Sequence, residues 1–173
     1  LLGDLHDGVG AALSGIRLTS KEPRVTRLAQ DALFELQSFL YPGPGYHLDW
    51  EHYVAELRAY GNSLFQEDKP RFVLRSSKLE GRVDRNKALS IFRLLKEALN
   101  NALKYAKASE IKVSLSVSEP GLLRLVVEDD GVGLGDDQGG RGMAGMRQRV
   151  EQLGGVFKVE NRSGTYLEVE LPL

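Results

Sequence analysis

The first forty residues carry apolar side chains at steps of three and four, the spacing of one face of an α-helix. Two such runs occur: Leu2, Leu5, Val9, Ala12, Leu13 and Ile16, then Val25, Leu28, Ala32, Leu36 and Phe39. Residues 19–23 interrupt the pattern, and Pro23 suits the first turn of a second helix. The pattern predicts a helical hairpin. Two short helices bury little surface alone, so the stripe favours a dimeric four-helix bundle, with packing on the rest of the same chain as the alternative.

The remainder of the chain alternates between helical and strand-like patterns. Residues 41–45, Tyr-Pro-Gly-Pro-Gly, cannot continue a helix. We therefore expect a hairpin at 1–41, a linker at 42–47 and a larger domain at 48–173. In that domain, helices are predicted at 49–66, at 84–106 with Asp84 as N-cap, and at 143–153; strands are predicted at 71–75, 111–117, 122–127, 156–160 and 166–171. This order predicts a fold of the α/β (α+β) class, a two-layer α/β sandwich with one mixed sheet.

The segment 128–146, EDDGVGLGDDQGGRGMAGM, holds two glycine clusters. The first, at 129–133, follows a predicted strand, and the second, at 139–142, leads into a predicted helix. Glycine permits positive φ and close approach to a ligand, and amides at a helix N-terminus favour phosphate. Asp129, at the strand end, can accept a hydrogen bond from an amino group. This layout suits a nucleotide, although the spacing is neither a dinucleotide fingerprint nor a Walker loop, and a plain surface loop is the alternative.

The predicted helix 84–106 has an apolar face and a polar face. Glu97, Asn101 and Lys104 lie within two turns on the polar face, where they bring together a carboxylate, a neutral oxygen ligand and a cation. Mg²⁺ prefers hard oxygen ligands and keeps water and phosphate in its shell, and a lysine can neutralise phosphate. The alternative is an ordinary solvated face, although asparagine inside a helix carries a propensity cost.

Composition narrows the classes of function. A formal net charge of −1 gives no electrostatic case for nucleic acid or an anionic membrane as partner. The lack of cysteine excludes disulfides, thiol catalysis and cysteine-ligated metal, and the three histidines, His6, His47 and His52, lack zinc-site spacing. No apolar run approaches the ~18 residues of a membrane span. We expect a cytoplasmic fragment without membrane contact, and leave open a membrane anchor upstream of Leu1 in a longer protein.

Several motifs resemble, in the same order, those of the sensor histidine kinases. Residues 95–106, LKEALNNALKYA, resemble their N-box; 129–133 resemble the first glycine box; 140–146, GRGMAGM, resemble the second; 154–155 and 163–165 resemble the strand turns that close the same ATPase domain. Residues 4–7, Asp-Leu-His-Asp, resemble the phosphoacceptor box of the subfamily that pairs with response regulators carrying LuxR-type DNA-binding domains.

The resemblance implies roles for the residues that would handle the phosphoryl group. His6 would be the phosphoacceptor, and Asp7 would orient it or take its proton. Glu97 would act on the water shell of the metal or as a base, and Asn101 would coordinate Mg²⁺. Lys104 would meet the phosphates of ATP. The residues themselves support His6, because neutral imidazole is a competent nucleophile near pH 7 and an adjacent carboxylate can hold the attacking tautomer.

The resemblance also implies roles around the nucleotide. Asp129 would accept a hydrogen bond from the adenine amino group, and Gly131 and Gly133 would shape the base pocket. The remaining matches are Gly140, Gly142 and Gly145, which would form the lid hinge and the phosphate-facing helix start, and Thr165, which would sit near the adenine.

As a whole, the resemblance implies an ATP-dependent kinase, a homodimer that phosphorylates His6 and passes the phosphoryl group to an aspartate of a response-regulator receiver domain. A serine kinase of the anti-sigma type and a non-catalytic dimerisation module are the alternatives. The chain departs from the family in a shorter hairpin, in Tyr105 where histidine is frequent, and in Ala11 where the subfamily has glutamine. In the family that glutamine is thought to orient the water that dephosphorylates the regulator, so we expect weak or absent phosphatase activity.

Overall fold

The computed structural model describes residues 2–40, 47–65, 70–77, 79–119, 121–134 and 140–173. Within these ranges, the side chains of residues 2–7, 23, 34–35, 37–40, 119 and 140–141 lie outside the description. The chain divides into two compact units, one formed by residues 1–66 with 82–89 and the other by residues 67–81 with 90–173.

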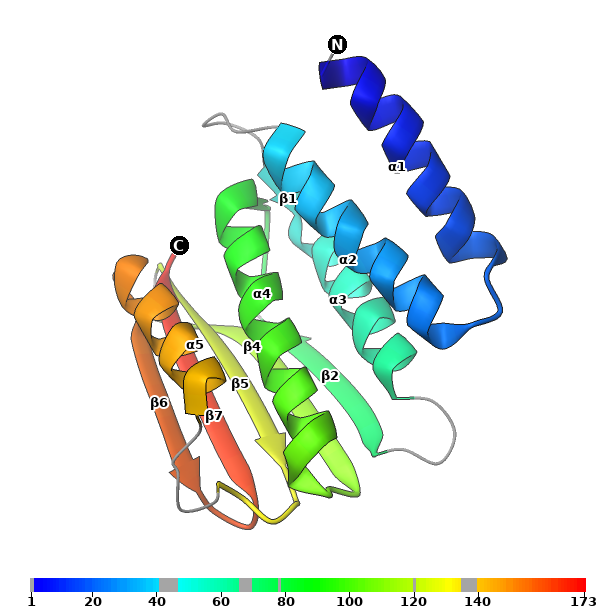
Figure 1. The fold of residues 1–173 in the computed structure, drawn as a ribbon. Coiled ribbons are helices and arrows are strands. Elements are labelled where there is room, and N and C mark those ends of the chain that lie inside the picture. The colour runs from blue at the N-terminus through cyan, green and yellow to red at the C-terminus, as the bar shows by residue number, and fades with distance from the viewer. Residues whose placement is uncertain (1, 41–46, 66–69, 78, 120, 135–139) are drawn as a thin grey trace. The chain divides into compact units, whose positions relative to one another are not determined.

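In the first unit, the two helices predicted for the N-terminal hairpin are present as α1 (Leu2–Thr19) and α2 (Pro23–Leu40) (Figure 1). Helix α2 contacts both α1 and α3 (Trp50–Leu64). Three members of the predicted apolar stripe stay exposed on this single chain, Val9 at 39%, Ile16 at 43% and Leu28 at 65%. Part of the stripe is therefore available to a partner.

A two-stranded sheet in the same unit was not predicted. Strand β1 (His47–Asp49) pairs antiparallel with β3 (Arg82–Asp84), so that His47, assigned to the linker from the sequence, begins a strand. Three-residue strands are too short to show an alternating pattern. Both strands end in an aspartate that caps the following helix. Asp49 Oδ1 accepts from the amide of Glu51 at 2.9 Å, and Asp84 Oδ1 accepts from that of Asn86 at 2.9 Å, which confirms the predicted N-cap at Asp84.

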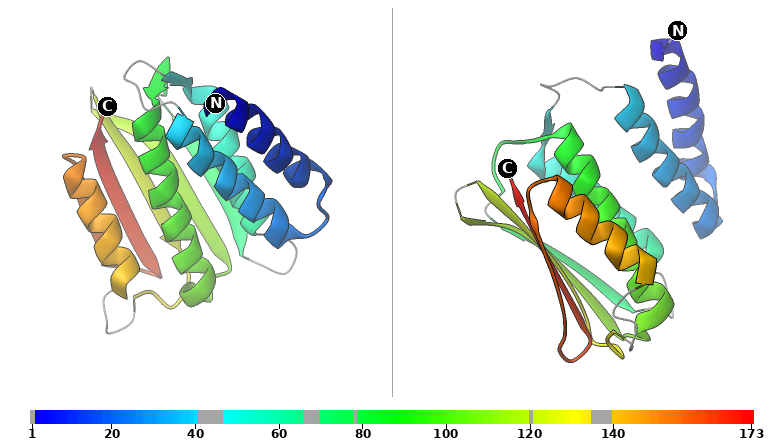
Figure 2. Two further views of the ribbon diagram at one scale, coloured as in Figure 1. Left: turned by 45° about the horizontal axis from the view of Figure 1, so that its top comes forward. Right: turned by 60° about the vertical axis from the view of Figure 1, so that its left-hand side comes forward.

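The second unit holds a five-stranded sheet in the order β2-β4-β5-β7-β6. The strands are β2 (Arg71–Ser77), β4 (Glu110–Glu119), β5 (Leu122–Asp129), β6 (Val156–Asn161) and β7 (Thr165–Pro172). Strands β2 and β4 are parallel and the other neighbours are antiparallel, so the sheet is mixed. Helices α4 (Arg85–Asn101), of which residues 90–101 belong to this unit, and α5 (Gly140–Gln152) cover one face of the sheet (Figures 1 and 2). The predicted α/β sandwich is confirmed.

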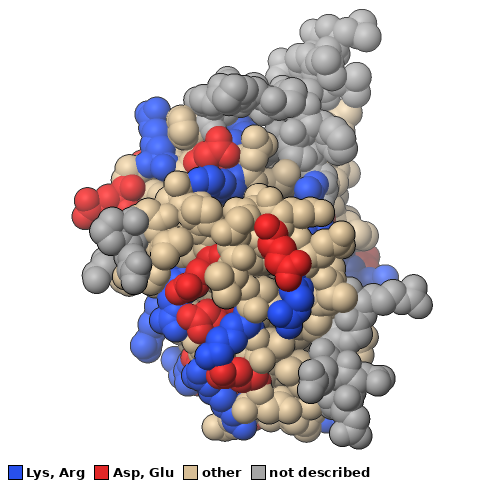
Figure 3. All heavy atoms as spheres, turned by 90° about the vertical axis from the view of Figure 1, so that its left-hand side faces the viewer, with Lys and Arg blue, Asp and Glu red and all other residues tan. Residues whose placement is uncertain are grey.

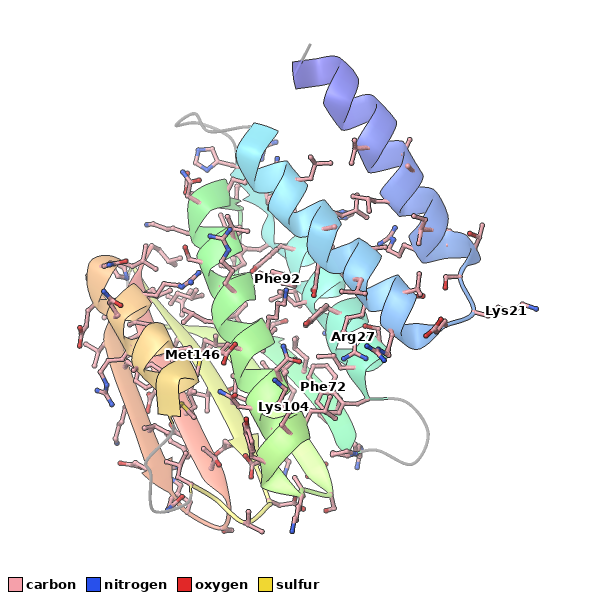
Figure 4. All side chains as sticks on the ribbon, viewed as in Figure 1. Lys21, Arg27, Phe72, Phe92, Lys104 and Met146 are labelled. Atoms are coloured by element: carbon pink, nitrogen blue, oxygen red, sulfur yellow. The ribbon has the colours of Figure 1, made fainter. Side chains whose placement is uncertain are left out.

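The core of this unit lies between the two helices and the sheet. The apolar face of α4 is buried, with Phe92 and Leu99 at 1% and 0% exposure. Alternate residues of the strands face it, among them Ile111, Val113, Leu115, Leu123, Leu125, Val127, Leu167 and Val169. Met146 of α5 is buried as well (Figure 4). Since one face of α4 is fixed in this core, its other face is held in a set orientation.

None of the helices in the described part of the chain has the length and apolarity needed to cross a bilayer.

Candidate nucleotide-binding site

A cavity of about 670 Å³ lies in the second unit, a volume in the range of small-molecule sites. Of the residues predicted for the site, it is lined by Glu97, Asn101, Lys104, Asp129, Gly133, Gly142 and Thr165. Its apolar walls were not predicted, and they include Ala98, Ala102, Val127, Leu134, Met143 and Leu167. Polar groups at a few points on an apolar wall are typical of a pocket that orients one ligand.

The polar face of α4 supplies one side of the cavity. Glu97 and Asn101 are half-buried, and Lys104 is exposed near the end of the helix (Figure 4). The sequence predicted an unbroken α-helix to residue 106, but its last part, Ala102–Ala106, is a π-helix. Short π segments are rare in proteins, and those that occur are often found at functional sites. The π-helix ends at Lys107, whose φ of 51° is left-handed.

Asp129 is the last residue of β5, and one of its carboxylate oxygens already accepts two hydrogen bonds. Its Oδ1 accepts from the backbone N–H of Gly131 at 2.9 Å and from that of Thr165 at 3.1 Å. Gly164 packs so closely on Asp129 that a Cβ there would lie 2.7 Å from Oδ1. These contacts fix the carboxylate, and the second oxygen, which makes neither of these bonds, can accept from a ligand in the cavity.

The first glycine cluster is held against the end of α4. The Val132 N–H donates to the Ala106 carbonyl at 2.8 Å, and a Cβ on Gly131 would overlap that carbonyl. Gly133 has a φ of +74°, a conformation that L side chains rarely adopt. Close packing at Gly131 and positive φ at Gly133 explain why both positions require glycine, and Gly133 also lines the cavity.

Asp130, next in the chain, ties the same cluster to the start of β4. Its Oδ1 accepts from the N–H groups of Ser109 at 2.8 Å and Glu110 at 2.9 Å, and its Oδ2 accepts from the Ser109 hydroxyl. The Ser109 hydroxyl bond, followed by the Glu110 amide bond, lowers the pKa of the Asp130 carboxyl to about 2. The two adjacent aspartates therefore differ: the hydrogen bonds of Asp130 are structural, whereas Asp129 borders the cavity.

The second glycine cluster begins α5. Gly140 is its first residue, and Gly142 packs against the α4 side chains, where a Cβ would overlap Glu97 Oε1 and lie 3.4 Å from Asn101 Nδ2. Gly145 has open space around it, so packing does not explain that glycine. The N-terminal amides of α5 thus lie beside the carboxylate and amide of the predicted N-box, an arrangement that suits a phosphate chain.

Two predicted residues fall outside the described side chains. His6 and Asp7 belong to α1, but their side chains are not described, and α1 is part of the other unit. The cavity therefore accounts for the nucleotide half of the predicted site, and the phosphoacceptor remains a prediction.

Tyr105 and Asn161 are two polar residues to which the sequence analysis gave no role in the nucleotide pocket. Tyr105 lines the cavity and is 68% exposed. Asn161, the last residue of β6, forms hydrogen bonds with the backbone N–H and carbonyl of Leu134, which lines the cavity. Asn-Arg-Ser-Gly at residues 161–164 is typical of any turn, so the pattern held no signal for this contact.

Comparisons with known proteins identify a family for this part of the chain. Residues 86–173 match the family model described as histidine kinase-, DNA gyrase B-, and HSP90-like ATPase. The chain is 39% identical over 103 residues to the signal transduction histidine-protein kinase/phosphatase UhpB of Salmonella typhimurium, covering 56% of this chain and 20% of that protein. It is 28% identical over 177 residues to the signal transduction histidine-protein kinase/phosphatase DegS of Brevibacillus brevis, covering 97% of this chain and 43% of that protein. It therefore spans less than half the length of either relative.

The fold is similar to that of the histidine kinase domain of the blue-light activated histidine kinase EL346 from Erythrobacter litoralis. The TM-score is 0.64 at 23% identity, covering 99% of this chain and 80% of that one.

Proposed function

Because the chain belongs to the histidine kinase-, DNA gyrase B-, and HSP90-like ATPases, we propose that it is the kinase core of a sensor histidine kinase. Its reaction would be transfer of the γ-phosphoryl group of ATP to His6, followed by transfer to an aspartate of a response-regulator receiver domain. The sensor histidine kinases among its relatives support this proposal.

The observation that carries the proposal is the environment of Asp129. Two backbone N–H groups, of Gly131 and Thr165, saturate Oδ1 and hold the carboxylate plane. Asp129 lines the cavity, so Oδ2 would accept a hydrogen bond from the exocyclic amine of adenine. Guanine carries a carbonyl oxygen at that position and would meet the carboxylate with like polarity. The site would therefore select ATP over GTP.

The opposite end of the cavity would bind the phosphates. Lys104 and the first amides of α5 would neutralise charge there, and phosphoryl transfer depends mainly on positioning and on such neutralisation. Glu97 would act on a water or as a base. These residues combine a cation and helix-terminal amides beside a carboxylate, which is a suitable lining for a metal–triphosphate complex.

The donor set also fits Mg²⁺. Glu97 and Asn101 offer hard oxygen atoms to one end of the cavity, and no group of three His, Cys, Asp or Glu side chains suited to a metal occurs among the described residues. A site with so few protein ligands fits an ion that keeps water and phosphate in its shell. Asn101 would be the protein ligand, and Mg²⁺, when bound with ATP, would supply positive charge to the phosphate oxygens.

The hairpin would provide the phosphoacceptor and the dimer. His6 lies in the first half of α1, where Asp7 would hold its attacking tautomer. The exposed side chains of Val9, Ile16 and Leu28 support pairing of two hairpins, since burying them requires a second apolar surface. Movement of the ATPase domain would then bring ATP to His6.

The test is labelling with ATP that carries the label in either the γ or the α phosphate, in the presence of Mg²⁺. We expect the chain to take up only the γ label, as phosphate that is acid-labile and base-stable, and His6→Ala to take up none. Acid-stable phosphate would indicate a hydroxyl acceptor, as in a serine kinase, and no transfer from a chain that binds ATP would indicate a non-catalytic module.

A further inference from the structure

One turn of the second unit makes hydrogen bonds with two residues that line the cavity, Asp129 and Leu134. The β6–β7 turn runs from Asn161 to Thr165, which face each other in the register of the two strands. The Arg162 N–H donates to the Gly164 carbonyl at 2.8 Å and closes the turn. Its last residue, Thr165, donates its N–H to Asp129 Oδ1. Its first residue, Asn161, contacts Leu134 instead.

The Asn161 side chain pairs with the backbone of Leu134 as another strand would. The Leu134 N–H donates to Asn161 Oδ1 at 2.6 Å, and Asn161 Nδ2 donates to the Leu134 carbonyl at 3.2 Å. Leu134 and its neighbour Gly133 line the cavity. A Cβ on Gly133 would lie 2.6 Å from Asn161 Oδ1, so the amide also packs on the residue whose φ is positive. Asn161 itself is not among the cavity-lining residues described.

Charged groups anchor the residues that flank Asn161 in the turn. The Arg162 guanidinium lies 3.3 Å from the centre of the Tyr166 ring and donates from Nη2 to Glu160 Oε2 at 3.0 Å. The Tyr166 hydroxyl donates to Glu168 Oε2 at 2.8 Å. Figure 3 shows that basic and acidic side chains are interspersed on part of the face drawn there. Because this network holds the turn in place, Asn161 can in turn hold the Gly133–Leu134 segment.

We propose that Asn161 is a positioning residue of the nucleotide site, which holds Gly133 and Leu134 in the conformation that receives the base. The proposal rests on the proposed nucleotide binding and adds a residue outside the cavity to it. Without the two hydrogen bonds, the Gly133–Leu134 segment samples other conformations, and a ligand must select the competent one, which lowers the apparent affinity by the competent fraction. For the loss of two exposed hydrogen bonds we expect roughly a fivefold to tenfold rise in the Kd for ADP.

The experiment measures ADP binding by calorimetry and amide hydrogen exchange by NMR on the full chain. Asn161→Ala should raise the Kd as stated and speed exchange of the Leu134 amide, with little change at the Leu167 amide in the neighbouring strand. Asn161→Asp keeps the acceptor for the Leu134 N–H but sets a second carboxylate oxygen against the Leu134 carbonyl, so it should restore neither the wild-type Kd nor the wild-type exchange rate. Ser163→Ala, at an exposed position of the same turn, is the matched control and should bind ADP as the wild type does.

A double-mutant cycle gives a second readout. Gly133→Ala places its methyl group against Asn161 Oδ1, so its effect on ADP affinity should be smaller in the Asn161→Ala background than in the wild type. Unchanged ADP affinity and Leu134 exchange in Asn161→Ala would overturn the proposal. Equal loss of protection at Leu134 and Leu167 would also overturn it, because it would assign Asn161 to general stability. A wild-type chain that fails to bind ADP would instead contradict the proposed function.

Discussion

Replacement of Asp129 by asparagine separates the role of this residue in the fold from its role in recognising adenine. In the wild type, Oδ1 accepts two backbone N–H groups, those of Gly131 and Thr165. An asparagine oxygen can accept both of these bonds. Its amide nitrogen then occupies the position of Oδ2 and presents hydrogens to the adenine amine, which is itself a donor. Asp129→Asn should therefore fold and fail to bind adenine nucleotides well.

The magnitude follows from the bond that is lost. A hydrogen bond to a charged acceptor contributes about 1.5–3 kcal/mol, which corresponds to a rise in the Kd for ADP of roughly tenfold to a hundredfold. Asp129→Ala is the comparison, because it removes the partner of both N–H groups. Each N–H left without a partner costs about 1–3 kcal/mol of unfolding free energy, toward the lower end where the site is half-buried as here.

Calorimetric titration with ADP and GDP, together with urea unfolding, gives both quantities. We expect Asp129→Asn to lose most of its affinity for ADP, to lose much less for GDP, whose carbonyl can accept from the new amide, and to unfold near the wild-type midpoint. An Asp129→Asn chain that is folded and binds ADP with wild-type affinity would refute the assignment of Asp129 to the adenine amine.

Three further substitutions test other parts of the account. Asn101→Ala should make ADP binding less dependent on Mg²⁺ in calorimetric titrations. The matched control is Asn100→Ala, which changes a neighbour that is not among the described cavity-lining residues and should leave the dependence as it is. An unchanged Mg²⁺ dependence in Asn101→Ala would exclude the ligand role. Asp130→Asn should reduce the loss of unfolding free energy when the pH falls from about 5 to 2. The pKa of the Asp130 carboxyl falls from 3.8 to about 2 on folding, so this group stabilises the fold above its unfolded pKa and stops doing so as pH falls through its folded pKa. Parallel acid-unfolding curves for the two chains would contradict this. Ala11 is exposed on α1, and its side chain offers no hydrogen bond to a hydrolytic water. The wild type should therefore not speed the decay of a phosphorylated regulator, and Ala11→Gln should gain that activity. Rapid decay with the wild type, unchanged in Ala11→Gln, would exclude the idea.

Much of the fold could be predicted from the sequence because long elements carry a clear period. The pattern at 84–106 placed Phe92 and Leu99 on an apolar face and Glu97 and Asn101 on a polar face; the structure buries the first pair, and the second pair lines the cavity. The resemblance of the ATPase motifs to the sensor histidine kinases is confirmed by the relatives. The β1–β3 pair and the π-helix at Ala102–Ala106 were missed, since neither changes the hydrophobic pattern enough to be detected.

For the site, sequence motifs identified residues but not the contacts that hold them. Nothing in Asp129-Asp130 shows that the first carboxylate borders the cavity and the second binds the start of β4, because that difference arises from tertiary hydrogen bonds. Likewise, Asn161 is 27 residues from Leu134, and no local pattern links them. The opposite case is Gly145, where the family motif implies a hinge and the structure shows open space.

The most direct test of the central claim is to locate the phosphate in the chain after incubation with Mg²⁺ and ATP. Trypsin releases residues 1–17 as one peptide, in which His6 is the single histidine and Ser14 is the single hydroxyl residue. Fragmentation at neutral pH should find one phosphoryl group on His6, removable by acid, and none in Asp129→Asn, which lacks tight ATP binding. Phosphate on Ser14 or outside this peptide, with His6 unmodified in a chain that binds ATP, would contradict the account.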